Sequence, residues 1–269
     1  MIGVVFKRAI EEYFSNIRVM LSYGILFLFV VFFVFFQQFF FNSGSVFLSF
    51  NVLNIFDVLG IVLVLIFLYV FSFFISLTVY SVHRDVQNVS LDTYWNALFK
   101  DAALKIFFLY LILAVVFYAI SAIGFLYGVP FYALLINLII GLVVMFAPQS
   151  IVLDGAGIKE GIGKSFEFWS SNFVTGIGIF AIATVLLFIT LLIELGIDLI
   201  GLPGVIASFF IVLVVLVPFI EQAKSYAYLM KSDLLKSNEF VHANAPRIVR
   251  PKQLLGTRLR EKPRHGNKL

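Results

Sequence analysis

The chain contains no cysteine, which excludes a disulfide framework, a thiol nucleophile and a thiolate metal site. Its three histidines, His83, His242 and His265, lie far apart among 269 residues, so a histidine metal site has no ligand set. Charged residues make up only 13% of the chain, about half their share in soluble domains. We therefore expect no metal ion and no cofactor.

Apolar residues, by contrast, make up 62% of the chain and include 34 phenylalanines. Soluble domains are about 45–50% apolar. A core of this size could not bury so many apolar side chains, so most of the surface must be solvated by lipid. The composition excludes a soluble enzyme, a nucleic-acid-binding domain and a disordered regulator, and it favours an integral membrane protein.

Six apolar stretches are long enough to cross the bilayer, which takes about 20 helical residues for about 30 Å of hydrocarbon. Each is apolar on every side, so we predict helices rather than barrel strands. The stretches are Val19–Phe41, Val58–Val82, Ile106–Phe125, Phe131–Val152, Phe173–Ile193, and Val205–Ile220 with its continuation to Leu229. The predicted fold class is all-α and polytopic, with six transmembrane helices arranged as three hairpins.

Lysine and arginine segregate to one side of this predicted topology. The first, third and fifth connections, around Ser43, Gly128 and Gly201, contain neither residue, so all 19 basic residues fall on the other side. The positive-inside rule makes that side cytoplasmic. We therefore predict a multi-pass protein of the cytoplasmic (cell) membrane, with both termini in the cytoplasm.

An amphipathic pattern precedes each predicted hairpin, which indicates a helix lying in the headgroup region. The apolar stripes comprise Phe6, Ile10, Tyr13 and Ile17; Leu91, Trp95, Leu98 and Ala102; and Ile158, Ile162, Phe166 and Trp169. The transmembrane domain, residues 1–236, then divides into repeat units of about 1–84, 85–155 and 156–236. The alternative is that the chain has no internal repeat, because any membrane protein built from hairpins with charged inner connections would show a similar pattern.

Three aromatic residues of these stripes, Tyr13, Trp95 and Trp169, are predicted interfacial anchors of the aromatic belt. Pro148 and Pro218 occupy matching places in the second and third hairpins and should kink their helices, either as hinges or as packing features.

Glu221 and Lys224 lie three residues apart near the cytoplasmic end of the last span, a spacing that favours an ion pair. A gate is the functional alternative. Glu194 and Asp198 lie on one helix face at the outer boundary. They are interpreted as solvated carboxylates, with a cation or substrate mouth as the alternative.

Few polar residues lie at hydrocarbon depth, and the three considered for a polar path are Ser72, Asn137 and Thr184. Such side chains normally make contacts between membrane helices. A transporter would need them to line one continuous polar cavity.

The segment 237–269 is polar and rich in cations, so it is predicted to be a disordered cytoplasmic tail. Its cations should contact anionic lipid headgroups, at about 1 kcal/mol each near the surface. These cations include Arg247, Arg250, Lys252, Arg258, Arg260, Lys262 and Arg264. No nucleic-acid partner is expected.

A stretch of about 30 residues, from Ala147 through Pro148, Asp154, Glu160 and Ser165, resembles a prokaryotic family of six-span membrane proteins of unknown function. That family is related to the membrane domain that accompanies some glycerophosphodiester phosphodiesterases. Gly161 stands where the family usually has alanine. The resemblance implies a six-helix membrane module and carries over no catalytic residue.

The sequence therefore favours a non-enzymatic membrane protein that acts through lipids, a membrane-protein partner or its own copies. No acid–base pair or metal set lies at a plausible depth for catalysis. The alternative hypothesis is a transporter or permease subunit that moves a small molecule or a lipid.

Overall fold

The structure, a computed structural model, describes residues 2–35, 39–42, 45–48, 55–87 and 101–231. Within these residues, five helices are long and apolar enough to cross a membrane. They are Asp57–Val82, Ala103–Leu126, Pro130–Leu153, Phe173–Leu199 and Gly204–Met230. Five of the predicted spans are thereby confirmed, and the helical membrane class with them.

The elements of these five spans include two irregular helices. The span Pro130–Leu153 consists of two helices, and Gly204–Met230 contains a π-helical segment. The elements of the spans are α4 (Ile55–Gln87), α6 (Ala103–Leu126), α7 (Pro130–Val144), α8 (Ala147–Leu153), α10 (Phe173–Leu199), α11 (Gly204–Phe210), η3 (Ile211–Leu216) and α12 (Val217–Lys231). The helix α9 (Ile158–Ser171) lies between the spans Pro130–Leu153 and Phe173–Leu199.

The N-terminal region departs from the predicted single helix Val19–Phe41. It forms α1 (Ile2–Ser15), α2 (Ile17–Ser22) and α3 (Gly24–Phe35), followed by the antiparallel strands β1 (Phe39–Asn42) and β2 (Ser45–Leu48). The 12 residues of α3 cover about 18 Å, which is less than the hydrocarbon thickness. A sixth span formed by α2 and α3 together stays a prediction.

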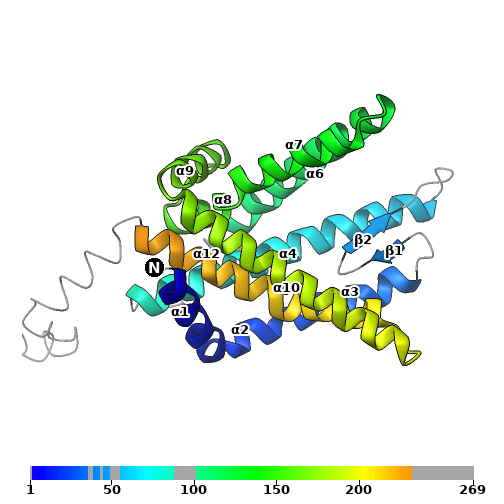
Figure 1. Cartoon of the computed structure of the whole chain (residues 1–269), viewed down its shortest axis with the longest axis horizontal. Helices are drawn as coiled ribbons and strands as arrows, with labels where there is room; N and C mark the ends of the chain where they lie inside the picture. Colours follow the sequence, from blue (N-terminus) through cyan, green and yellow to red (C-terminus); the bar gives the residue numbers. More distant parts are fainter. Residues whose placement is uncertain (1, 36–38, 43–44, 49–54, 88–100, 232–269) are drawn as a thin grey trace, which may run out of the picture.

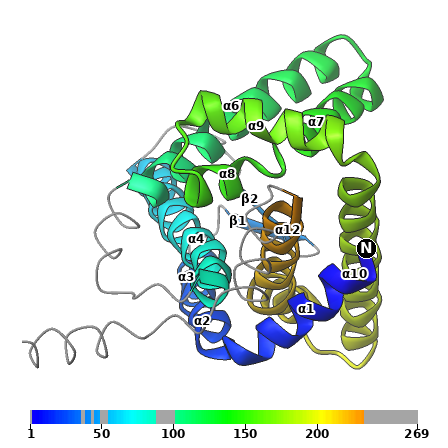
Figure 2. The same ribbon diagram turned by 90° about the vertical axis from the view of Figure 1, so that its left-hand side faces the viewer.

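The helices α4, α10 and α12 run along the long axis of the molecule, while α6 and α7 form a pair that diverges from them (Figure 1). The helices α1 and α9 lie across one end, where α12 also ends (Figure 2). The strands lie toward the opposite end. The end crossed by α1 and α9 carries the predicted cytoplasmic cations of both helices.

The two outer turns have the same backbone geometry. Gly128 has φ = 68° and Gly201 has φ = 79°, a left-handed conformation that glycine adopts without a Cβ clash. In each turn the glycine N–H bonds the carbonyl three residues earlier, and the next N–H bonds the carbonyl five residues earlier. Both helices therefore end in Schellman motifs, 73 residues apart. The repeat of the second and third units stays a prediction.

Most apolar side chains of the stripe on α9 pack against the protein, whereas the sequence predicted that they would face the bilayer. Ile158 and Ile162 pack against the core formed by α4, α6 and α8, whereas Phe166 is 59% exposed. Trp169 is buried against Phe146 and lies so close to Gly176 that a Cβ there would meet its indole at 3.0 Å. The structure thus corrects the predicted role of Trp169, because an interfacial anchor needs an indole that faces the bilayer.

Candidate functional site: a buried polar cluster between α8 and α12

An ion pair lies inside the protein near the end of the last span. Lys224 Nζ lies 2.5 Å from Glu221 Oε1, and the two side chains are 7% and 9% exposed. The helical spacing of three residues brings the two side chains to the same face of α12, as the sequence analysis expected. Burial of two charges is tolerated because each compensates the other.

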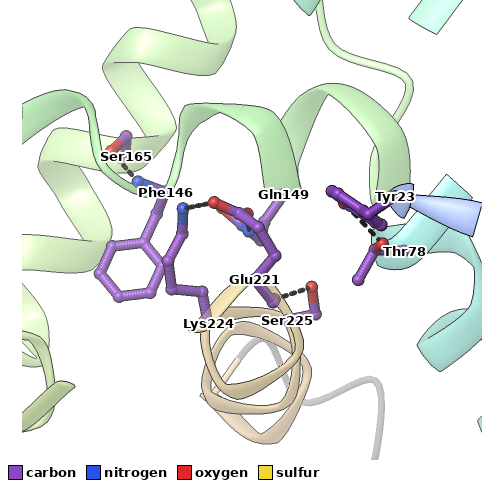
Figure 3. Close-up of polar contacts among 8 residues, drawn as sticks. All are labelled: Tyr23, Thr78, Phe146, Gln149, Ser165, Glu221, Lys224 and Ser225. Carbon is purple, nitrogen blue, oxygen red and sulfur yellow. Dashed lines mark hydrogen bonds and ion pairs between the residues drawn. The ribbon is translucent and has the colours of Figure 1, made fainter. Parts of the chain in front are cut away.

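The carboxylate of Glu221 has a second buried partner on a different element. Gln149, on α8, donates from Nε2 to Glu221 Oε2 at 2.8 Å (Figure 3). The carboxylate fixes the orientation of this amide, since the amide oxygen would be repelled by it. Gln149 Oε1 is therefore turned away, and it is buried without a hydrogen-bond partner. Ser225 Oγ also donates to the Glu221 carbonyl at 2.7 Å.

A second buried polar contact lies beside this cluster. Tyr23, at the break between α2 and α3, shares a hydrogen bond of 2.8 Å with Thr78 on α4 (Figure 3). Both side chains are buried, and the ring of Tyr23 also packs on Phe74. The contact holds the break between α2 and α3 to α4. Together with the bond between Gln149 of α8 and Glu221 of α12, it links four segments of the chain through buried polar side chains.

The break between α7 and α8 is closed by a side chain from α9. Pro148 lies in the first turn of α8 and has no N–H, so the helical bond pattern cannot run through it. Ser165 Oγ donates to the Val143 carbonyl at 2.5 Å and accepts from the Phe146 N–H at 3.1 Å. One hydroxyl therefore satisfies two backbone groups at the break. Figure 3 shows the contact of Ser165 with Phe146.

The crossing of α8 and α9 also depends on Gly161. A Cβ at this position would lie 3.0 Å from Ile151 Cγ1 and 3.1 Å from Ser150 Oγ. Ser150 in turn donates to the Ala147 carbonyl at 3.1 Å. The absence of a side chain at Gly161 therefore lets the two helices approach closely here.

Charged side chains hold the end of α8 to α9 and α12. Lys164 Nζ lies 3.2 Å from Asp154 Oδ2 and 3.0 Å from Glu160 Oε1, and Tyr228 OH donates to Asp154 at 2.7 Å. The hydrogen bond from Lys164 lowers the pKa of the Glu160 carboxyl. The same bond raises the pKa of Lys164. Gly155, at φ = 67°, turns the chain between these helices.

An apolar groove adjoins the cluster. It has a volume of 380 Å³ and lies among α4, α6, α7 and the start of α8, with Lys224 at its edge. A second crevice, of 330 Å³, lies between α1, α10 and η3, on another side of α12. Its lining side chains are apolar apart from Tyr13 and Thr190.

The residues of the predicted polar path are not brought together. Ser72 donates to the Leu68 carbonyl within α4, and Thr184 bonds its own helix in the same way. Asn137 of α7 donates a hydrogen bond of 2.9 Å to Ser121 of α6. It thus makes a contact between helices, as polar side chains in membrane spans normally do. Neither the groove nor the crevice is lined by any of the three.

The remaining predicted residues have varied surroundings. Pro218 lies at the second position of α12, directly after η3, so both prolines follow an irregularity in their spans. Tyr13 is half-buried and bonds the Val214 carbonyl at 3.3 Å. Burial raises the pKa of Tyr13. Trp95 and the tail cations Arg247, Arg250, Lys252, Arg258, Arg260, Lys262 and Arg264 lie outside the described residues.

The outer carboxylates correct one interpretation from the sequence. Glu194 is only 7% exposed, so it is not a solvated carboxylate. Asp198 accepts a hydrogen bond of 2.8 Å from the N–H of Gly204 at the start of α11. A Cβ at Gly204 would lie 2.3 Å from the Glu194 carbonyl, so this residue position requires glycine.

Three residues that organise the cluster had no assigned role in the sequence analysis. Gln149, Ser165 and Tyr228 each bond an element distant in the chain, and helical periodicity contains no signal for such contacts. For Gln149, the only local indication of a buried contact was that it is a polar residue in an otherwise apolar span.

The five long apolar helices and their lipid-exposed surfaces define the class: the chain is a multi-pass helical membrane protein. No known protein family matches the chain, and no curated protein or solved structure is similar to it. Among the described residues, no group of histidine, aspartate and glutamate could hold a metal ion.

Proposed function

We propose that this protein is a non-enzymatic component of a prokaryotic cytoplasmic membrane that acts by binding lipids, with a membrane-protein partner or its own copies as further contacts. In this proposal the chain crosses the bilayer six times, with both termini in the cytoplasm. We also propose that the chain is related to the six-span family that its residues 147–173 resemble.

The observation that carries lipid binding is the crevice between α1, α10 and η3. Ile10 and Phe14 of α1 line one wall, and Ile189 and Ile193 of α10 line the other. The helix α1 lies across the end of the molecule, whereas α10 is a membrane span (Figure 2). An apolar space beside an end helix and a span suits an acyl chain that enters from the cytoplasmic leaflet.

Native mass spectrometry of the full chain, released from nanodiscs of mixed phospholipids, tests lipid binding. We expect lipid adducts that survive activation, and fewer of them when Ile189→Trp fills the crevice. The matched control is Ile177→Trp, a substitution at another exposed isoleucine of α10. Release of bare protein from every variant, the unsubstituted chain included, would refute the proposal.

The proposed orientation has its own test, because the cysteine-free chain suits single-cysteine labelling. Tyr127→Cys and Leu202→Cys place thiols at the two exposed outer turns, and Ser171→Cys places one at the opposite end. We expect a membrane-impermeant thiol reagent to label the first two variants in intact cells and the third only after lysis. Labelling of Ser171→Cys in intact cells would invert the orientation.

A transporter subunit is the second candidate, and the buried pair Glu221–Lys224 favours it. Ionisable residues inside spans often mark substrate or ion pathways, and transporter sites often lie where helices are broken. A water path through the cluster would expose the buried Ser225 during the transport cycle. Labelling of Ser225→Cys by a hydrophilic thiol reagent would support transport, whereas an unreactive thiol favours the lipid-binding protein.

A further inference from the structure

The groove beside Lys224 lies at membrane depth. Its walls belong to four of the spans, and its lining is apolar apart from Tyr110 and Lys224. The medium around these helices is hydrocarbon, so an opening lined by such side chains takes an acyl chain more readily than water. The occupant must therefore carry an alkyl chain.

The size of the groove decides between a chain and a helix. An α-helix with side chains is about 10–12 Å across. A volume of 380 Å³ would be filled by less than one turn of such a helix. A single alkyl chain is much thinner and fits lengthwise between α6 and α4, which excludes a partner helix as the inserted element.

The polar end of the groove decides the headgroup. Lys224 lines the groove and has three N–H donors, of which it gives one to Glu221. The oxygen of a hydroxyl headgroup can accept a hydrogen bond from this ammonium.

Charge balance points the same way. The pair Glu221–Lys224 is neutral as it stands, and both members are buried. A phosphate would add an uncompensated negative charge at this depth, and an ammonium headgroup would add a positive one; either charge is costly to desolvate. An uncharged headgroup keeps the cluster neutral.

We propose that this groove binds one acyl chain of a lipid with an uncharged hydroxyl headgroup, such as a monoacylglycerol, with a hydroxyl oxygen that accepts a hydrogen bond from Lys224. The proposal rests on the proposed lipid-binding function and names the lipid class and the site. It differs from anionic-lipid binding by the basic tail, because the recognition here depends on the absence of charge.

The test uses a monoacylglycerol with a diazirine in its acyl chain, added to the full chain in phosphatidylcholine nanodiscs. After irradiation, labelled peptides are mapped by mass spectrometry. We expect labels on groove residues of α6, such as Leu113 and Phe117, and on Val144 of α7. A phosphatidylglycerol probe with the same acyl chain should label them several-fold less, and excess unlabelled monoacylglycerol should compete.

The matched variants are Gly141→Leu and Gly196→Leu. Gly141 lines the groove, and a Cβ there would make only an ordinary contact of 3.8 Å with Phe117, whereas Gly196 has nothing within 4 Å. Each buried methylene contributes severalfold to affinity, so displacing a few should lower labelling by at least about tenfold in Gly141→Leu. Labelling of Gly196→Leu should match that of the unsubstituted chain.

Three outcomes would overturn the proposal. They are equal labelling in both variants, preference for the phosphatidylglycerol probe, and the absence of label from the groove residues. The unsubstituted chain also separates this proposal from the general one. Lipid adducts without groove labelling refute only the groove, whereas the absence of all adducts refutes lipid binding itself.

Discussion

Replacing Ser165 with alanine should destabilise the protein far more than an ordinary serine substitution. The hydroxyl bonds both the Val143 carbonyl and the Phe146 N–H, and Ser165 is fully buried. An unsatisfied buried polar group costs about 1–3 kcal/mol, so the loss of partners for two groups should lower the free energy of unfolding by about 2–6 kcal/mol. Pro148 prevents the helix from closing the break itself.

The matched control is Ser170→Ala on the same helix. Ser170 Oγ also donates to a backbone carbonyl, that of Glu167 at 2.8 Å, but it is exposed, so we expect a change within about 0.5 kcal/mol. The fluorescence of Trp169, which packs on Phe146, reports unfolding in mixed detergent micelles, in a Trp95→Phe background. Equal free energies of unfolding for Ser165→Ala and Ser170→Ala would refute the bridging role.

Three further predictions use the same unfolding assay. Gly161→Ala should destabilise because its Cβ would meet Ile151 at 3.0 Å, whereas Gly163→Ala, with nothing within 4 Å, should stabilise by about 0.5–1 kcal/mol; a reversed order would contradict the close helix crossing. Lys224→Met should cost about 3–5 kcal/mol by leaving a buried carboxylate, and adding Glu221→Gln should recover part of that loss; strictly additive losses would count against the pair. Because the folded pKa of Glu160 is lowered, its stabilising contribution is present above its ordinary value of 4.5 and is lost as the pH falls through the folded value. Glu160→Gln should flatten stability in that range, and an unchanged pH profile would contradict the ion pair.

Composition and apolar run length predicted the parts of the fold that depend on solvation. Five spans were located to within a few residues at most of their ends, because a helix must hide its backbone from hydrocarbon over the full thickness of the bilayer. The same criterion predicted one continuous helix over Val19–Phe41, whereas the structure has a break at Tyr23 and a helix α3 that ends at Phe35. Hydropathy contains no information about the Thr78 hydroxyl that holds Tyr23.

Local spacing likewise predicted contacts within one helix and little beyond. The pair Glu221–Lys224 followed from three residues of separation, and the outer turns followed from Gly128 and Gly201. The sequence could not show which way α9 would face, since Trp169 suits both an aromatic belt and a protein core.

By itself, the sequence determined that this chain belongs in a membrane, where most of its helices run, and which residues form its turns, because these properties follow from transfer free energy and local backbone geometry. The tertiary structure alone decided that Gln149 meets Glu221 and that Ser165 closes the break before Pro148. It also placed an apolar groove against a neutral ion pair. These contacts join residues 19 to 72 positions apart, and such pairings depend on how the helices cross.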